Sequence, residues 1–261
     1  LASFGLQDSA IVVLASGFLD PASAPNGNAA FGLWVAIPSG GQLVQLPEST
    51  VPVQVIHNSA DLAADTVDVW YNNLKIIPNF AFRTASPFVN LPSGVSFDIS
   101  ITLPNSVDTV GAVYREDGLE LVAGAQYTII AYGIVSPSGY SPNTPFELYI
   151  FDNAQLRSDT AGNTDVRVFH GATDAPAVRV NEVGVGAGNI ISGLSYGNID
   201  PIGDYLELAT DDYVLQVEDN GQTVTVGEYL APLQTLGLED SALVVLASGF
   251  LDPSVNSSGP G

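Results

Sequence analysis

A repeated segment constrains this chain more than any other feature of its sequence. Residues 5–21 read GLQDSAIVVLASGFLDP, and residues 237–253 read GLEDSALVVLASGFLDP. The two copies lie 232 residues apart and differ only at Gln7/Glu239 and Ile11/Leu243. Chance does not produce such a match, and self-similarity of this kind is the signature of a repeat protein. The sequence therefore predicts a parent protein built from long repeats, of which this chain holds slightly more than one.

A second, more diverged repeat divides the long one. VQVIHNSAD at 53–61 aligns with VRVFHGATD at 166–174, and FELYI at 146–150 aligns with FGLWV at 31–35. A looser match joins residues 127–133 to residues 242–249. We therefore expect an A-type domain at 51–163 and a related B-type domain at 164–261. Residues 1–50 are then the C-terminal strands of a preceding B-type domain.

The B-type copy at 164–261 lacks one strand that its relatives have. FGLWV has no equivalent after Pro253, where the sequence ends in VNSSGPG, which predicts a flexible linker with a glycosylation sequon at Asn256. An incomplete sandwich exposes an unpaired sheet edge, and residues 1–50 hold strands without a domain. We therefore expect head-to-tail assembly by strand addition, between copies of the chain or between covalent neighbouring repeats. The expected assembly strands, at 10–18 and 31–37, carry Ile11, Val13, Phe31, Leu33, Trp34 and Val35.

The hydrophobic pattern predicts strands throughout. Phe97, Ile99, Ile101 and Leu103 alternate with polar residues, as in a half-buried strand. The runs at 11–14, 127–132 and 243–246 are apolar at successive positions, which indicates strands with apolar surroundings on both faces. Turn signals at 92–94, 117–118 and 220–221 separate strands, and no window has a helical period. The predicted fold is all-β: tandem Ig-like or transthyretin-like β-sandwich domains, with an N-terminal two-strand remnant.

The composition excludes several kinds of partner. The chain has 28 acidic residues against 6 lysines and arginines, a net charge of −22. Such a surface repels nucleic acid and anionic membranes, so we expect neither nucleic-acid binding nor membrane insertion. The absence of cysteine excludes disulfides, thiolate catalysis and cysteine-bound zinc.

Two histidines recur with an aspartate four residues later, as His57 with Asp61 and His170 with Asp174. Each histidine continues a row of valines that face the core, so we expect a buried, neutral imidazole that fixes the following turn. The alternative is a metal ligand or a general base, but one histidine in each domain is too few for a two-histidine zinc site.

Acidic residues in loops are the remaining candidates for a metal site. Solvated loop carboxylates explain them, and calcium is the alternative, because it takes carboxylate oxygens. The candidates are Asp61, Asp65, Asp68, Asp211 and Asp212.

Two further patterns have weak functional interpretations. Ser195 lies in a G-x-S-x-G match, but the glycines and proline that follow prevent the helix that a nucleophile elbow needs. We therefore expect no enzymatic activity. Four aromatic residues are candidates for a sugar-binding platform, with strand packing as the simpler interpretation: Trp34, Trp70, Tyr71 and Tyr149.

The opening of each domain also carries a family resemblance. HGATDAP at 170–176, followed by Val178-Arg-Val180, and LVAGAQYTI at 121–129 resemble the domain-of-unknown-function 4397 family, although domain A has Leu62-Ala63 where the motif has Ala-Pro. The resemblance implies a secreted or surface-exposed microbial β-domain, often in tandem, and it supplies no activity.

Together these features predict a non-catalytic structural repeat module of an extracellular filament, surface fibre or adhesin stalk. A glycan- or protein-binding adhesion module assisted by calcium is the alternative.

Overall fold

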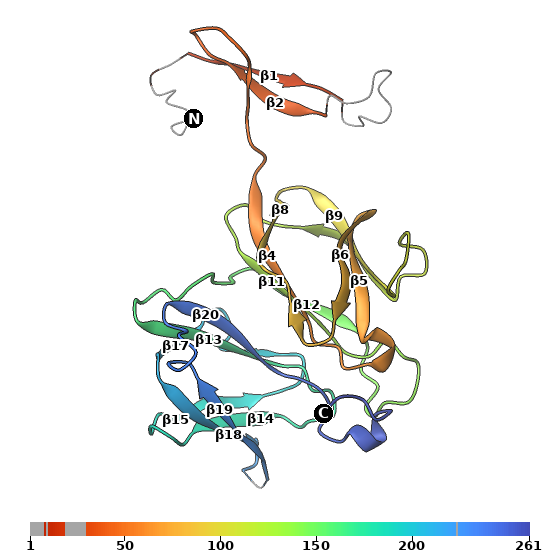
Figure 1. The fold of residues 1–261 in the computed structure, drawn as a ribbon, viewed down its shortest axis with the longest axis vertical. Helices are drawn as coiled ribbons and strands as arrows, with labels where there is room; N and C mark the ends of the chain where they lie inside the picture. The colour runs from red at the N-terminus through yellow and green to blue at the C-terminus, as the bar shows by residue number, and fades with distance from the viewer. Residues whose placement is uncertain (1–7, 9, 19–29, 223) are drawn as a thin grey trace. The chain divides into compact units, whose positions relative to one another are not determined.

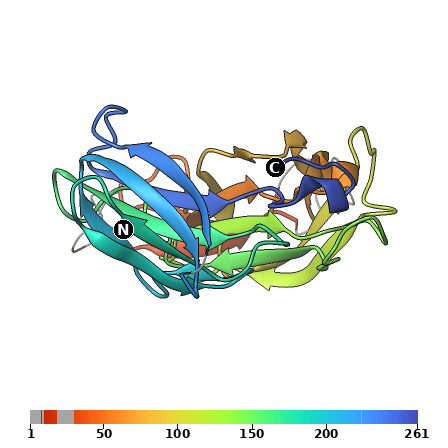
Figure 2. The ribbon, with the colours of Figure 1, turned by 90° about the horizontal axis from the view of Figure 1, so that it is seen from below.

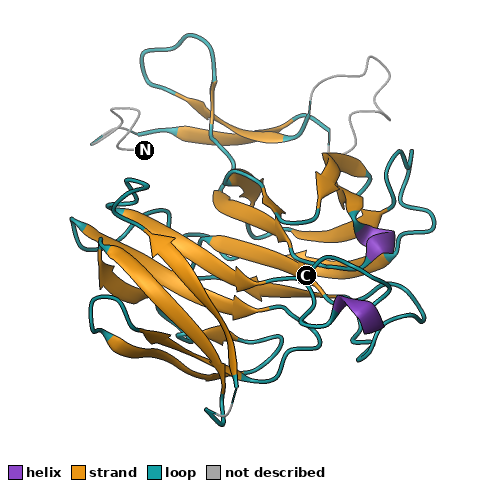
Figure 3. Ribbon diagram, turned by 60° about the horizontal axis from the view of Figure 1, so that its bottom comes forward, coloured by secondary structure: helices purple, strands orange, loops and turns teal. Residues whose placement is uncertain are grey.

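The computed structural model describes residues 8, 10–18, 30–222 and 224–261, and it is all-β, as the sequence predicts. The chain divides into two compact units, residues 1–49 and 50–261. In the described residues, strands dominate and two short 3-10 turns, η3 (Leu62–Ala64) and η4 (Pro253–Val255), are the helical pieces (purple in Figure 3).

The first unit is a small antiparallel sheet. Its strand order is β1-β2-β3, with β1 at Val12–Ser16, β2 at Gly32–Ala36 and β3 at Val44–Gln45. Leu14 pairs with Trp34, and Val13 pairs with Val35. The short third strand is an addition to the two that the sequence predicts. The sequence repeat at 5–21 lies partly outside the described residues, whereas both predicted assembly strands lie within them.

The second unit begins with a two-sheet sandwich, domain A. One sheet has the order β10-β9-β5-β6; the other has the order β12-β11-β4-β7, with β8 also paired to β4 (Figure 1). The strands are β4 (Thr50–His57), β5 (Thr66–Tyr71), β6 (Leu74–Ala81), β7 (Thr84–Ala85), β8 (Val89–Pro92), β9 (Ser96–Thr102), β10 (Tyr114–Glu120), β11 (Tyr127–Tyr132) and β12 (Glu147–Phe151).

Domain B repeats this arrangement and lies beside A in the same unit (cyan and blue in Figure 2). Its outer sheet has the order β15-β14-β18-β19, and its other sheet joins β16, β17 and β20 to β13. The strands are β13 (Asn163–His170), β14 (Val178–Glu182), β15 (Gly188–Leu194), β16 (Ile199–Asp200), β17 (Leu206–Ala209), β18 (Asp212–Asp219), β19 (Thr225–Pro232) and β20 (Ser241–Ala247).

The two domains match strand for strand until the last one. In A, β11 pairs with β4 in parallel, with Ile129 beside Val55; in B, β20 pairs with β13 in parallel, with Val245 beside Val168. β11 also pairs with β12, but within the described residues β20 has β13 as its one partner. Among the described residues, no strand takes the place beside β20 that β12 takes beside β11, and the outer edge of β20 is open there.

The alternating residues form the core of A. Phe97, Ile99 and Ile101 are buried on β9, but that strand ends before Leu103, which is exposed. The predicted turn at 117–118 is instead a β-bulge inside β10, where Gly118 takes a φ of 73°. A bulge needs an extra residue in an unusual backbone conformation, and glycine adopts it without steric cost.

Candidate functional site

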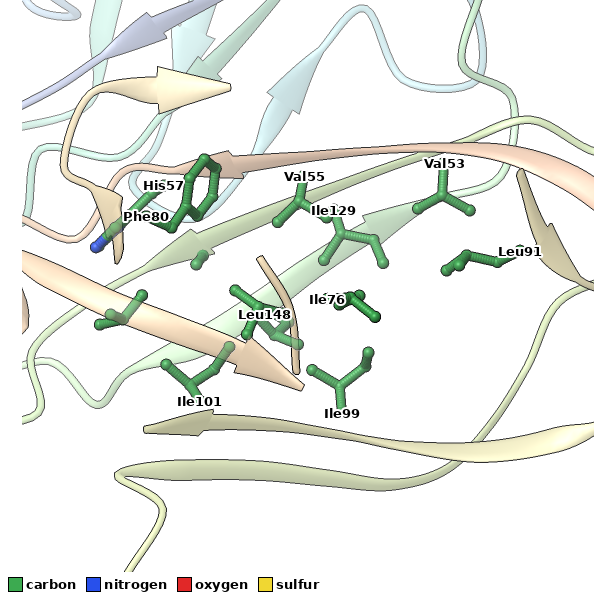
Figure 4. A pocket seen from close by; sticks show the side chains of 13 residues that line it. Val53, Val55, His57, Ile76, Phe80, Leu91, Ile99, Ile101, Ile129 and Leu148 are labelled. Atoms are coloured by element: carbon green, nitrogen blue, oxygen red, sulfur yellow. The ribbon is translucent and has the colours of Figure 1, made fainter. Parts of the chain in front are cut away.

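His57 and His170 lie at the ends of the first strands of the two domains. His57 follows Val53 and Val55 along β4 and lies beside Phe80, where side chains from both sheets of A converge (Figure 4). Its side chain is fully buried, and its Nε2 lies 2.8 Å from the carbonyl oxygen of Ala64. A carbonyl oxygen only accepts hydrogen bonds, so Nε2 carries the proton and donates a hydrogen bond to the 3-10 turn η3.

His170 repeats this contact in domain B. It is also fully buried, and its Nε2 lies 3.0 Å from the carbonyl oxygen of Pro176. Burial away from water lowers the pKa of both His57 and His170 below the ordinary value of 6.5. Both rings are therefore neutral at pH 7, and each holds the turn that follows its strand.

The stability of the chain is expected to fall as the pH drops from 6.5 to 5. Each histidine has a folded-state pKa below its unfolded value of 6.5. Its contribution is therefore complete above that pH and is lost as the unfolded state takes up the proton. The linkage slope limits the loss to about 2 kcal/mol per histidine over this window. Thermal unfolding at pH 7 and pH 5 measures it, and a double variant, His57→Asn with His170→Asn, should show a flatter profile. An equally steep profile in that variant would assign the loss to other groups.

Asp61 ties the turn after β4 to the loop after β11. Its carboxylate accepts hydrogen bonds from the backbone N–H groups of Ala63, Val135 and Ser136 and from the Tyr140 hydroxyl, at 2.6–2.9 Å. Burial acts to raise its pKa, but these hydrogen bonds outweigh it and keep the pKa below the ordinary value. Asp61 is thus an ionised internal clamp.

Asp174 makes the equivalent clamp in domain B. It accepts hydrogen bonds from the N–H groups of Leu251 and Asp252, both at 2.8 Å, and from Nδ2 of Asn256 at 3.0 Å. The loop after β20 is therefore held in the same way as the loop that leads from β11 to β12. The aspartate of the motif secures this loop in both domains, while the histidine holds the turn after the first strand.

The segment expected to be a flexible linker is folded. Asn256 is fully buried, and its Oδ1 accepts a hydrogen bond from the Ser141 N–H of domain A at 2.8 Å. The N–H of Phe250 also donates to the carbonyl oxygen of Pro260 at 2.8 Å. The linker prediction is wrong because these long-range hydrogen bonds hold polar residues that local composition assigns to a loop. A buried side chain that is already hydrogen-bonded is also an unsuitable glycan acceptor. The asparagine of the sequon therefore has a structural role in this fold.

The loop acids do not converge. Asp68 is buried and forms an ion pair with Lys75, whose Nζ lies 2.6 Å from its Oδ2. Burial acts to raise the pKa of Asp68, but the lysine and the Asn79 N–H outweigh it and keep the pKa lowered. Asp65 is exposed. Asp212 holds the N–H and hydroxyl of Thr235. In the described part of the chain, no three acidic or histidine side chains gather where a metal could bind, Asp61 and Asp211 included.

The other sequence candidates take part in turns and packing. Ser195 lies in the exposed turn between two strands, β15 and β16, where a nucleophile elbow would have a helix. Trp70 is buried, and its indole N–H donates to Thr102 at 2.9 Å, while Tyr71 stacks on Phe97 at 4.6 Å. Trp34 lies on β2 and is half-buried.

Domains A and B pack through an apolar interface between their sheets. Tyr132 and Tyr149 of A contact Phe169 of B, with ring centroids 5.1 Å and 5.2 Å apart. Phe169 is fully buried. The cluster also contains Ile56, Ile130, Phe151, Ala154, Ile199, Tyr196, Val244 and Leu246. The second apolar face that the sequence predicts for 127–132 and 243–246 is therefore the contact with the neighbouring domain.

A groove lies between β20 and domain A, beside the apolar cluster. It measures about 490 Å³. From A, it is lined by residues of β4 and β7, among them Gln54, Ile56 and Thr84; from B, it is lined by Leu243, Val244 and Leu246. Val245, whose counterpart Ile129 is 4% exposed in A, is 40% exposed on this strand. The edge thus leaves part of the core of B uncovered.

Sequence reasoning missed two polar residues that position these elements. Arg167 is buried, donates to Asn153 Oδ1 at 2.8 Å across the interface and lies over the rings of Phe151 and Tyr205. Its one available signal is an arginine inside an apolar strand of a chain with very few bases. The Glu182 carboxylate accepts hydrogen bonds from backbone N–H groups of the glycine-rich loop after β14. Burial acts to raise its pKa, but these hydrogen bonds outweigh it and lower the pKa to about 2.

Comparison with known protein families gives a match to this chain. The family model described as Domain of unknown function (DUF4397) matches residues 51–181, which is half of the chain. The chain belongs to this family. The match covers domain A and the first two strands of B, so both His-Asp clamps lie in the DUF4397 region. No curated protein matches the chain. Within the described residues, no helix has the length and apolar character to cross a membrane.

Proposed function

We propose that this DUF4397 chain is a non-catalytic structural repeat module of an extracellular filament, surface fibre or adhesin stalk. The observation that carries the proposal is the apolar contact between A and B around Phe169, which joins two successive repeats into one compact unit. Repeats that bury their faces against their neighbours are the physical basis of elongated repeat proteins.

The polar residues of the unit support this role. Asp61, Asp174 and Asn256 use their side chains to tie loops together, and His57 and His170 hold turns. The net charge of −22 keeps neighbouring fibres apart at low salt and suits an extracellular surface. For the alternative, a glycan-binding adhesion module, no observation adds support, because Trp70, Tyr71 and Tyr149 are engaged in packing.

Immunogold electron microscopy tests the proposal. Antibodies raised against the purified chain are applied to intact cells that produce the protein. We expect gold particles along surface fibres, at regular intervals set by the repeat. Labelling that is confined to permeabilised cells would overturn the proposal.

A further inference from the structure

We infer that the open edge of β20 is a binding site for β2 of a second copy of this chain. This inference rests on the proposed function and names the partner surface through which modules would join. It follows from three observations: the sequence identity of β1 and β20, the register of β1 with β2, and the shape of the groove beside β20.

The first observation is that this structure already contains a strand with the sequence of β20 paired to β2. VVLAS of β1 recurs as VVLAS at 244–248, with the neighbouring residues also repeated. In the first unit, that sequence forms an antiparallel ladder with β2. β2 is therefore a strand whose side chains already fit alongside this sequence.

The second observation is that β1 and β2 pair like the last two strands of domain A. Leu14 is opposite Trp34 and Val13 is opposite Val35; in A, Ile130 is opposite Tyr149 and Ile129 is opposite Ile150. β12 completes domain A from this position. A β2 strand in the same register on β20 would place Trp34 opposite Leu246, Val35 opposite Val245 and Leu33 opposite Ala247.

The third observation is that the groove corresponds to the space that β12 fills at the other end of the interface. There, Phe151 lies under Arg167 at 5.1 Å, and Tyr149 contacts Phe169. The equivalents of Arg167 and Phe169 in the short repeat are Gln54 and Ile56, and both line the groove. Trp34 on β20 would therefore contact Ile56, and Val35 would face the core of B.

The exposure of β1 and of Val245 favours the exchange of β2 from β1 to β20. All five residues of β1 are exposed, and small sheets of this kind are marginally stable in water. Moving β2 onto β20 replaces the β1 ladder by a ladder with the same side chains. It also covers Val245 and places Trp34 against an apolar surface.

Disulfide trapping tests the register, because the native chain has no cysteine to interfere. Full-length Val35→Cys, with a tag that changes its mass, is mixed with untagged Val245→Cys and oxidised. Opposed residues in paired strands are close enough for a disulfide, so the mixed dimer should exceed that of a Val35→Cys and Val244→Cys control about tenfold. Leu33→Cys with Ala247→Cys is a second pair in the same register, in case Val35→Cys disturbs its own sheet.

A further substitution tests the groove. Trp34→Ala in the donor chain should lower the yield of mixed dimer, whereas Leu43→Ala, at an exposed residue outside the strands of the first unit, should leave it unchanged. Mixed dimers no more abundant than the control, for both cysteine pairs, would overturn the inference. If fibres are labelled by the antibody while both pairs fail, strand addition is wrong and the fibre role stands. If the pairs form and no fibre is labelled, the binding site stands and the fibre role fails.

Discussion

Replacing Phe169 by alanine is expected to lower the free energy of unfolding of domain B by about 3–5 kcal/mol, the usual loss for a buried phenylalanine. The side chain is fully buried at the interface, where its ring contacts the rings of Tyr132 and Tyr149. Its removal leaves a cavity on both sides of the contact. We therefore expect the two domains to lose their coupling as well.

Chemical denaturation of the full-length chain measures this effect. All variants carry Trp34→Phe, so that Trp70 is the one remaining tryptophan and its fluorescence reports on domain A, whereas circular dichroism reports on strands of both domains. In the native chain, the two signals should change together; in Phe169→Ala, circular dichroism should change first. Leu230→Ala, at a residue 78% exposed, is the control and should shift stability by less than about 0.5 kcal/mol. An unchanged midpoint for Phe169→Ala would show that the interface does not stabilise B.

Replacing Asp61 by alanine is expected to cost domain A about 3 kcal/mol or more, since each buried donor left without a partner costs about 1–3 kcal/mol. The substitution removes the acceptor of the Val135 and Ser136 N–H groups and of the Tyr140 hydroxyl. The loop after β11 should then become mobile, although the strands themselves are untouched.

Thermal unfolding and amide hydrogen exchange measure the two parts of this prediction. Asp65→Ala is the matched control, because Asp65 lies in the same turn with an exposed side chain. Asp61→Asn keeps one acceptor oxygen and should lie between the alanine variant and the native chain. Equal stability of Asp61→Ala and Asp65→Ala would mean that the clamp contributes nothing.

Much of the fold could be predicted from the sequence because its determinants are local. Alternation along β9 and unbroken apolar runs at 127–132 and 243–246 indicate strands, and the two repeats indicate that related domains recur. The order of His57 after Val53 and Val55 indicates which face the imidazole takes. Turn signals were less informative, since Asp117-Gly118 gives a bulge rather than a chain reversal.

The tertiary structure alone decided which surfaces meet. An apolar run indicates that β11 and β20 have apolar surroundings on both faces, but not that the second face of each meets the neighbouring domain around Phe169. Asn256 looks like part of a linker because its partners, Ser141 and Asp174, lie more than 80 residues away in the sequence. Period and propensity act between neighbours along the chain, whereas the parallel pairing of β13 with β20, the loop clamps and the groove beside β20 depend on contacts that form only when distant segments fold together.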